Sequence, residues 1–170
     1  KILLLAPHPF YQERGTPIAV DLLLRVLSAR GETVDVLTYH EGADIQYPGV
    51  RILRIPSPRL AHRVPPGFSM KKLICDWALA RSLSGAVKAQ SYDLIHAVEE
   101  SAFLARWIGS RRGLPYLFDM DSSMPRQIMD KMPAMKLAGP IMQACERRAI
   151  RDALAVVTMC DSLAEHAGKS

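Results

Sequence analysis

Cysteine, aromatic residues and long apolar runs are all scarce in this sequence, and each scarcity excludes a class of protein. The 170 residues include three cysteines, Cys75, Cys145 and Cys160, which lack CxxC spacing. Their spacing argues against a cysteine-based zinc site or a disulfide framework, and we expect ordinary buried thiols. No apolar run is long enough to span a membrane, and the opening KILLLAPHPF breaks at Pro7 before a signal peptide could form. We therefore expect a cytoplasmic protein.

The glycine-rich motifs of common nucleotide-binding proteins are also missing. Neither GxGxxG nor GxxxxGK[ST] occurs, so the chain carries no dinucleotide fingerprint and no P-loop. The second predicted strand ends in Tyr39-His40 and not in an acidic residue, which disfavours a dinucleotide-dependent oxidoreductase. Aromatic residues are only 6% of the chain and do not interleave with basic ones, so we expect no nucleic-acid partner.

Apolar residues, 49% of the chain, suffice for one core, so we expect a single domain over residues 1–170. Short apolar runs typical of buried strands alternate with segments of helical periodicity. The predicted strands are 1–6, 33–39, 50–55, 92–98, 114–120 and 153–159, and the predicted helices are 17–30, 69–90, 99–113, 134–152 and one beginning at 160. This alternation predicts an α/β fold with a doubly wound, mainly parallel, Rossmann-like sheet.

Some of these segments carry finer expectations. The 69–90 helix is expected to have one apolar side, formed by Leu73, Trp77, Ala80 and Leu83. We expect the 134–152 helix to bend at Pro140. Two segments without periodicity, 56–68 and 121–133, are expected to be irregular loops, and loops of that length are often functional.

Ligands bind open parallel sheets outside the carboxyl ends of the strands. The loops to search are therefore 7–16, 98–101 and 119–127, which follow the first, fourth and fifth predicted strands. In the last of these, Asp119 and Asp121 alternate at the end of a strand. Paired carboxylates serve acid/base chemistry or hold a metal, and Asp119 is our main candidate for a catalytic residue. Nothing in the sequence demands a metal or a cofactor.

The first loop combines features of an anion site with those of a simple helix start. Thr16 is a good N-cap, and Pro17 suits the first helical turn. Gly15 allows close approach of a ligand, and Arg14 adds a positive charge to the dipole of the helix N-terminus. His8 is a candidate substrate-binding residue, with a capping or solvated role as the alternative.

Two further features have more than one interpretation. Glu99 and Glu100 begin a predicted helix, where they either compensate its dipole or recognise an acceptor hydroxyl. The net charge is +5, and no acidic residue lies between Asp44 and Asp76. That interval holds Arg51, Arg54, Arg59, Arg63, Lys71 and Lys72. Such a one-sign segment forms a solvated face, an anionic membrane contact, a nucleic-acid contact or a pocket for an acidic substrate.

Four stretches in order resemble a known family. They are KILLLAPHPFYQERGTPIAVDLLLRVLSARGETVDVLTY, YDLIHAVEE, PYLFDMDSS and ERRAIRDALAVVTMCDSLAEH. Together they resemble the N-terminal half of a GT-B glycosyltransferase of retaining family 4. The resemblance implies two Rossmann-like domains around a cleft, with the nucleotide-sugar held mainly by a C-terminal domain that lies beyond this sequence. It also implies that the fragment alone is inactive.

The resemblance assigns roles to single residues. Arg14-Gly15 stands where the family commonly has Gly-Gly beside the donor diphosphate, and only Gly15 matches, while Thr16 follows at the helix start. Asp119 stands where many members have a residue facing the transferred sugar, and His96 matches a strand histidine with either a structural or a substrate-binding role.

The sequence thus leads to one functional hypothesis and one alternative. The hypothesis is the acceptor-side domain of a glycosyltransferase that moves a sugar from a nucleotide diphosphate-sugar to a hydroxyl of a glycan or lipid. Residues 51–72 would then contact an anionic acceptor or the inner face of the membrane. The alternative is a non-catalytic Rossmann-like module that binds a nucleotide or another ligand.

Overall fold

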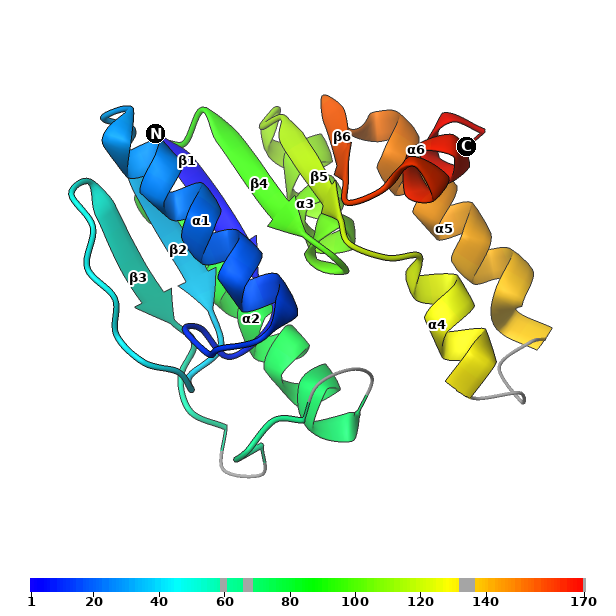
Figure 1. Cartoon of the computed structure of the whole chain (residues 1–170), viewed down its shortest axis with the longest axis horizontal. Coiled ribbons are helices and arrows are strands. Elements are labelled where there is room, and N and C mark those ends of the chain that lie inside the picture. Colours follow the sequence, from blue (N-terminus) through cyan, green and yellow to red (C-terminus); the bar gives the residue numbers. More distant parts are fainter. Residues whose placement is uncertain (59–60, 66–68, 132–136, 170) are drawn as a thin grey trace. The chain divides into compact units, whose positions relative to one another are not determined.

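In the part of the chain that the structure describes, six β-strands and six α-helices mostly alternate, as the pattern of apolar residues predicts. The computed structural model describes residues 1–58, 61–65, 69–131 and 137–169. Its strands are β1 (Ile2–Ala6), β2 (Val34–Thr38), β3 (Val50–Arg54), β4 (Leu94–Val98), β5 (Tyr116–Met120) and β6 (Ala155–Thr158). They form one sheet of order β3-β2-β1-β4-β5-β6 (Figure 1), and the pairs β1–β2, β2–β3 and β5–β6 are parallel. The predicted doubly wound α/β fold is confirmed.

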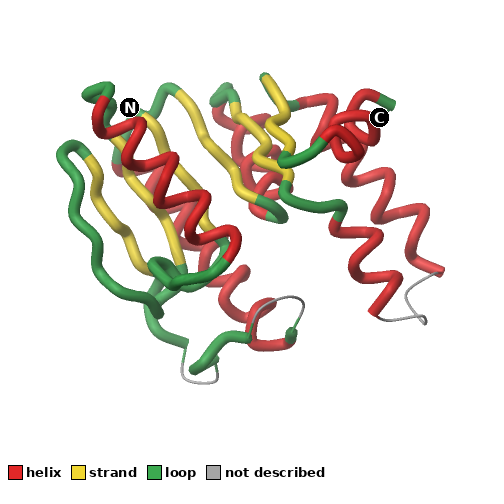
Figure 2. Tube along the Cα trace, in the orientation of Figure 1, coloured by secondary structure: helices red, strands yellow, loops and turns green. Residues whose placement is uncertain are grey.

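The helices are α1 (Gly15–Ala29), α2 (Met70–Ala89), α3 (Ser101–Arg112), α4 (Met124–Lys131), α5 (Gly139–Asp152) and α6 (Asp161–Gly168), drawn in red in Figure 2. Two expectations are wrong here. The segment 121–133 is not an irregular loop, because α4 occupies most of it. The helix expected over 134–152 begins only at Gly139, so Pro140 lies in its first turn, where a proline causes no bend. Residues 132–136 lie outside the described residues.

The chain divides into two compact units, Lys1–Ile95 and His96–Ser170, and the single domain expected over 1–170 stays a prediction. In the first unit β1 and β2 are buried almost throughout, while α1 and α2 cover opposite faces of the strands (Figure 1). Burial of both faces explains why β1 reads as a continuous apolar run, while β2 also buries the polar Asp35 and Thr38.

Helix α2 faces the core differently from the expectation. Its buried residues are Cys75, Leu79 and Leu83, spaced four apart, whereas Leu73 is 43% exposed and Trp77 is 64% exposed. Apolar residues at helical spacing form more than one stripe along α2. Only the stripe of Cys75, Leu79 and Leu83 is buried. The other stripe is left on the surface.

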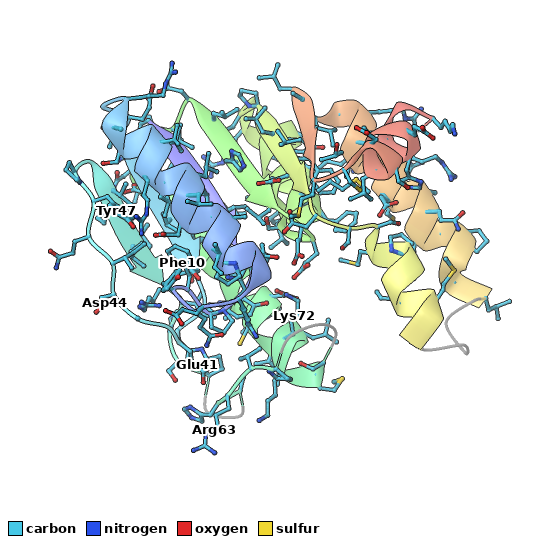
Figure 3. The ribbon with its side chains drawn as sticks, in the orientation of Figure 1. Phe10, Glu41, Asp44, Tyr47, Arg63 and Lys72 are labelled. Carbon is cyan, nitrogen blue, oxygen red and sulfur yellow. The ribbon has the colours of Figure 1, made fainter. Side chains whose placement is uncertain are left out.

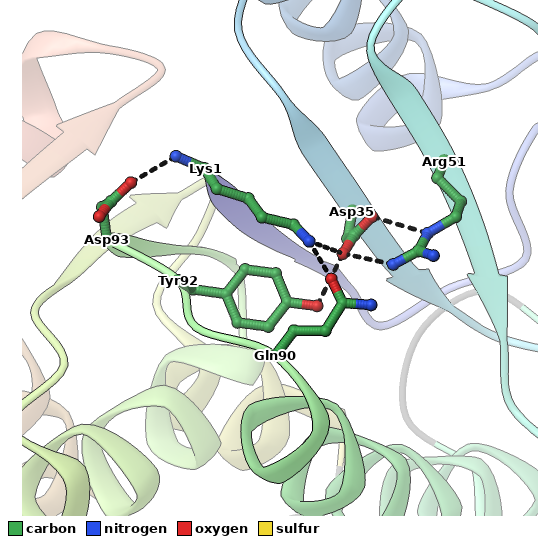
Figure 4. A network of polar contacts seen from close by, with 6 residues as sticks. All are labelled: Lys1, Asp35, Arg51, Gln90, Tyr92 and Asp93. Carbon is green, nitrogen blue, oxygen red and sulfur yellow. Dashed lines mark hydrogen bonds and ion pairs between the residues drawn. The ribbon is translucent and has the colours of Figure 1, made fainter.

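A buried carboxylate ties the strands of the first unit together (Figure 4). Asp35 of β2 accepts hydrogen bonds from Arg51 Nε (2.9 Å), Arg51 Nη2 (2.8 Å) and Tyr92 Oη (2.7 Å), and Lys1 Nζ lies 3.3 Å from its Oδ2. Burial alone would raise the pKa of Asp35, but the hydrogen bonds from Arg51, Tyr92 and Lys1 outweigh it and hold that pKa below its usual 3.8. Burial and the bond to Asp35 raise the pKa of Tyr92 to about 12.

The second unit packs α3 and α5 together beside β5. Its core includes Ala102, Ala105, Ile108, Phe118, Met120, Ala149 and Ile150. The Tyr116 hydroxyl donates to the Ala149 carbonyl oxygen, which fixes β5 to α5. Of the three thiols, only Cys75 is buried, and burial raises its pKa to about 11. Cys145 and Cys160 are exposed, so the expectation of three buried thiols is wrong.

Candidate functional site

The loop after β1 is joined to the loop after β2 by main-chain hydrogen bonds. The Phe10 N–H donates to the Glu41 carbonyl oxygen (3.1 Å), and Tyr11 and Ala43 exchange bonds of 3.0 and 2.9 Å. Gly42 has φ +126, and a Cβ on it would lie 2.1 Å from the Phe10 carbonyl oxygen. Only glycine fits this close approach, so the two loops are built as one unit.

Arg54, at the end of β3, holds these loops from the side. Its Nη1 donates to the carbonyl oxygens of Phe10 (2.7 Å) and Glu41 (3.0 Å), and its Nη2 donates to those of Ala43 (3.0 Å) and to the Asp44 carboxylate (2.9 Å). Three of the residues that Arg54 contacts, Phe10, Glu41 and Asp44, are labelled in Figure 3. The five donors of arginine suit such a convergence of acceptors. The sequence signal for this role, an arginine at the end of a strand beside an irregular loop, was missed.

Lys72 of α2 supplies a second positive charge to the same region (Figure 3). Its Nζ donates to the Pro7 carbonyl oxygen (2.6 Å). Arg51, Arg54 and Lys72 therefore use their charges inside the unit, and the basic segment 51–72 is less available to a ligand than its composition suggests. Arg59 of that segment lies outside the described residues.

His8 is buried in the first loop, with 6% of its surface exposed. Its Nδ1 lies 3.2 Å from the Pro9 carbonyl oxygen, and its buried Nε2 has no hydrogen-bond partner in the part of the chain that the structure describes. Burial lowers the pKa of His8 to about 4; a hydrogen bond to Pro9 opposes this shift, and the positive charges of Lys72 and Arg14 add to it. The imidazole is therefore neutral at physiological pH and has one nitrogen left to pair.

Helix α1 begins two residues earlier than its capping pattern suggests. The N-cap is Arg14, which has extended backbone geometry and no side-chain capping bond, so the expectation of a Thr16 N-cap is wrong. Thr16 instead lies inside the first turn, and Pro17 lies there as expected. Nothing lies within 4 Å of the position that a Cβ on Gly15 would take, and no acidic residue occupies the first turn. The positive end of the helix dipole is thus not neutralised by its own first turn.

In the second unit, the predicted residues after β4 and β5 lie together. His96 Nε2 lies 3.2 Å from Asp119 Oδ2, and the Glu99 N–H donates to the Asp119 carbonyl oxygen (2.8 Å). Glu100 is the N-cap of α3 but makes no side-chain capping bond, and Glu99 has φ 51. Both glutamates therefore precede the helix and do not lie in its first turn, where a dipole-compensating acid is expected.

A buried network beside this site was missed by sequence reasoning. The Ser123 hydroxyl donates to the Glu146 carboxylate at 2.9 and 3.1 Å, and His166 Nε2 lies 2.9 Å from Glu146 Oε1. Glu146 is only 3% exposed. Serine and histidine bond to the same carboxylate and not to each other, so the arrangement does not activate a nucleophile. It joins the start of α4 to α5 and α6.

The sequence and the fold are both similar to those of known glycosyltransferases. Residues 14–169 match the family model of the glycosyl transferase 4-like domain. A comparison with curated proteins yields no match. Among solved structures, the fold is similar to sucrose-phosphate synthase from Thermosynechococcus elongatus, with a TM-score of 0.66, 17% identity and 99% of this chain covered. It is also similar to Arabidopsis thaliana UGT89C1 complexed with UDP, with a TM-score of 0.56, 16% identity and 96% covered.

The matches cover almost all of this chain but less than half of each solved structure. The chain spans 44% of the sucrose-phosphate synthase and 46% of UGT89C1. At such low identity the two structures support the Rossmann-like fold, while the family model covers nearly the whole of this sequence. The chain belongs to the glycosyl transferase 4-like domain family.

Proposed function

We propose that this chain is the acceptor-side domain of a retaining glycosyltransferase that transfers a sugar from a nucleotide diphosphate-sugar to a hydroxyl acceptor. The observation that carries the proposal is the family match over residues 14–169. The fold likeness to UGT89C1, solved with UDP and with UDP-L-rhamnose, supports a nucleotide-sugar as the donor. The donor pocket is assigned mainly to a further, C-terminal domain of the same protein, so residues 1–170 alone are expected to be inactive.

The start of α1 is assigned to the donor diphosphate. Its N-terminus presents main-chain N–H groups and the positive end of the dipole, and Arg14 adds a full charge at the N-cap. A fixed dipole and a cation stabilise the negative charge that grows on the leaving diphosphate during transfer. The neutral His8, with its unpaired Nε2, is assigned to a sugar or acceptor hydroxyl.

The residues after β4 and β5 are assigned to the sugar and the acceptor. Asp119 is proposed to accept a hydrogen bond from a hydroxyl at the reacting centre, with His96 holding its carboxylate at 3.2 Å. Glu99 and Glu100, which lie outside the first turn of α3, are proposed to bind acceptor hydroxyls. None of these steps uses a metal.

A membrane contact is the second part of the proposal. Met70, Leu73 and Trp77 lie on one face of α2 and are 71%, 43% and 64% exposed. Arg63 and Lys71 lie near the start of that helix and are exposed as well. An apolar stripe flanked by basic residues suits the cytoplasmic surface of an anionic membrane. No helix in the described part of the chain is long and apolar enough to cross a bilayer.

The test compares matched variants in the longest natural protein that contains this chain. Arg14→Ala is expected to raise the Kd for UDP about tenfold, because one charge-assisted contact is worth roughly 1.5 kcal/mol. Arg30→Ala, at the other end of α1, is the control and should bind UDP normally. Asp119→Ala should lower kcat for sugar transfer by at least about 100-fold, whereas the exposed Asp161→Ala should not.

Two results would contradict the proposal. Equal loss of UDP affinity in the Arg14 and Arg30 variants would remove the helix start from the donor site. Tight binding of UDP without any sugar transfer by the intact protein would favour the non-catalytic module.

A further inference from the structure

Three potential metal ligands converge in the first unit, and the main chain of one of them, Glu41, bonds to the loop that carries His8. His40 and Glu41 follow β2 after Tyr39, and His62 comes from the described residues 61–65. One ligand atom from each of the three side chains lies within 4.8 Å of the others. The His40 and His62 rings meet edge to face, with centroids 5.9 Å apart. Residues about 20 positions apart in the sequence thus meet at one point.

His40 is the observation that calls for a ligand. Its side chain is 7% exposed, and neither of its ring nitrogens has a hydrogen-bond partner among the described residues. Nε2 lies 3.5 Å from Glu41 Oε1 without a hydrogen bond between them. Buried polar atoms are almost always paired, so an imidazole with two unpaired nitrogens indicates a missing partner. A cation between the imidazole and the carboxylate would supply that partner.

Glu41 is already oriented for such a role. Its Oε1 accepts from the Arg63 N–H and its Oε2 accepts from the Val64 N–H (3.0 Å). These bonds hold the segment that carries His62 against the carboxylate. Each carboxylate oxygen has a second lone pair for a metal, and ligands fixed by outer hydrogen bonds bind metals more tightly.

Nearby positive charges repel a bound cation and therefore lower the affinity of this cluster for a metal ion. Lys71 Nζ donates to the His62 carbonyl oxygen (2.7 Å), and Arg54 Nη1 donates to the Glu41 carbonyl oxygen (3.0 Å). Both cations donate to main-chain oxygens and not to the ligand atoms of the three side chains. Arg63 contributes its main-chain N–H to Glu41, and its side chain is exposed.

We propose that His40, Glu41 and His62 form a binding site for a divalent transition-metal ion, with Zn²⁺ the best match. Two imidazole nitrogens and one carboxylate oxygen suit Zn²⁺, whereas Mg²⁺ and Ca²⁺ prefer ligand sets made of oxygen alone. Three protein ligands leave one tetrahedral position for water or another group. This site is independent of the sugar-transfer proposal, which uses no metal.

Binding here would order the ligand-facing loops of the first unit. The metal would fix residues 61–65 to the end of β2, and the Glu41 carbonyl oxygen is bonded in turn to the loop after β1 through the Phe10 N–H. The proposed role is therefore structural, with an indirect effect on the loop that carries His8.

The experiment titrates the chelator-treated full chain with Zn²⁺ by calorimetry and with Co²⁺ by visible absorption. All proteins carry Cys145→Ser and Cys160→Ser, because these exposed thiols would bind zinc themselves. One equivalent of Zn²⁺ is expected to bind. His62→Asn should weaken binding more than about 100-fold, since losing even an outer partner costs 10–100-fold. His166→Asn is the matched control and should bind Zn²⁺ as the parent does.

His62 is the better variant because its side chain is exposed, so its replacement should leave the fold intact, as circular dichroism would check. His40→Ala, at a buried position, would be compared only if it folds. The proposal is overturned if the parent binds no Zn²⁺, if His62→Asn binds as tightly as the parent, or if Mg²⁺ binds as tightly as Zn²⁺.

Discussion

In the unit Lys1–Ile95, cationic side chains hold the loop that follows β1. Arg54 and Lys72 donate to the main-chain carbonyl oxygens of Phe10 and Pro7. In the unit His96–Ser170, a buried carboxylate holds the segment that follows β5, because Glu146 accepts from Ser123 and contacts His166. The first unit stabilises loop carbonyl oxygens with cations, and the second stabilises a hydroxyl donor and a histidine with an anion.

This difference changes the interpretation of charge in the sequence. The basic segment 51–72 predicts a positively charged surface, yet three of its cations are bonded to the protein itself. Loops that turn their carbonyl oxygens inward need many donors, and arginine offers the most. A run of like charges therefore indicates either a ligand or an irregular loop that needs support.

The largest effect on this comparison is expected from Arg54→Ala. The substitution removes the charged hydrogen bonds that Arg54 donates to the carbonyl oxygens of Phe10, Glu41 and Ala43, and the last two keep only their main-chain donors. We expect a loss of about 3 kcal/mol in the free energy of unfolding, measured by urea denaturation. Arg63→Ala is the control, because the exposed Arg63 side chain makes no such bonds in the described residues. Equal stability of the two variants would show that Arg54 does not hold the loops.

A smaller effect is expected from Glu146→Gln in the second unit. The amide keeps the shape and one acceptor oxygen, but it loses the charge that faces Ser123 and His166. We expect a loss of about 1–2 kcal/mol in urea denaturation. Glu165→Gln, on the exposed side of α6, should change stability by less than about 0.5 kcal/mol. A loss larger than that of Arg54→Ala would reverse the ranking of the two units.

The smallest effect concerns Asp35; it is present at neutral pH and is lost in acid. Its pKa is held below 3.8 in the folded chain, so its bonds stabilise the fold at neutral pH. That contribution is lost as the pH falls below 3.8 through the folded pKa, because protonation removes the charge that Arg51 and Tyr92 face. The urea midpoints of wild type and Asp35→Asn should differ at pH 7 and converge as the pH falls below 3.8. A gap that stays constant with pH would contradict this role.

Local patterns predicted the elements well where one interaction dominates. The runs KILLLA and TVDVLTY became β1 and β2. KILLLA is apolar because β1 is buried on both faces, whereas β2 also buries Asp35, which is paired with Arg51. The apolar pattern gave a wrong prediction where a helix has more than one apolar face. Trp77 was expected in the α2 stripe, yet contact with the strands selects Cys75, Leu79 and Leu83. Helix α4 was missed in 121–133, where Pro125 and Ile128 are buried in the second unit.

The candidate site divides in the same way. His8, Gly15 and Asp119 were predicted because loops at the carboxyl ends of parallel strands carry ligand contacts, and His96 was predicted from the resemblance to the family. The pairing of His96 with Asp119 required coordinates, since these residues belong to different strands. Neither the Arg54 contacts nor the meeting of His40 with His62 follows a local spacing rule, so no motif search would find them.

The sequence by itself determined the alternation of strands and helices and the membership of the glycosyl transferase 4-like domain family. Both depend on side-chain order over short distances, which periodicity and capping make visible. Only the tertiary structure decided which charges are used internally and which histidines meet. Those outcomes depend on packing between segments far apart in the chain, where burial and the need to pair every buried polar atom act together.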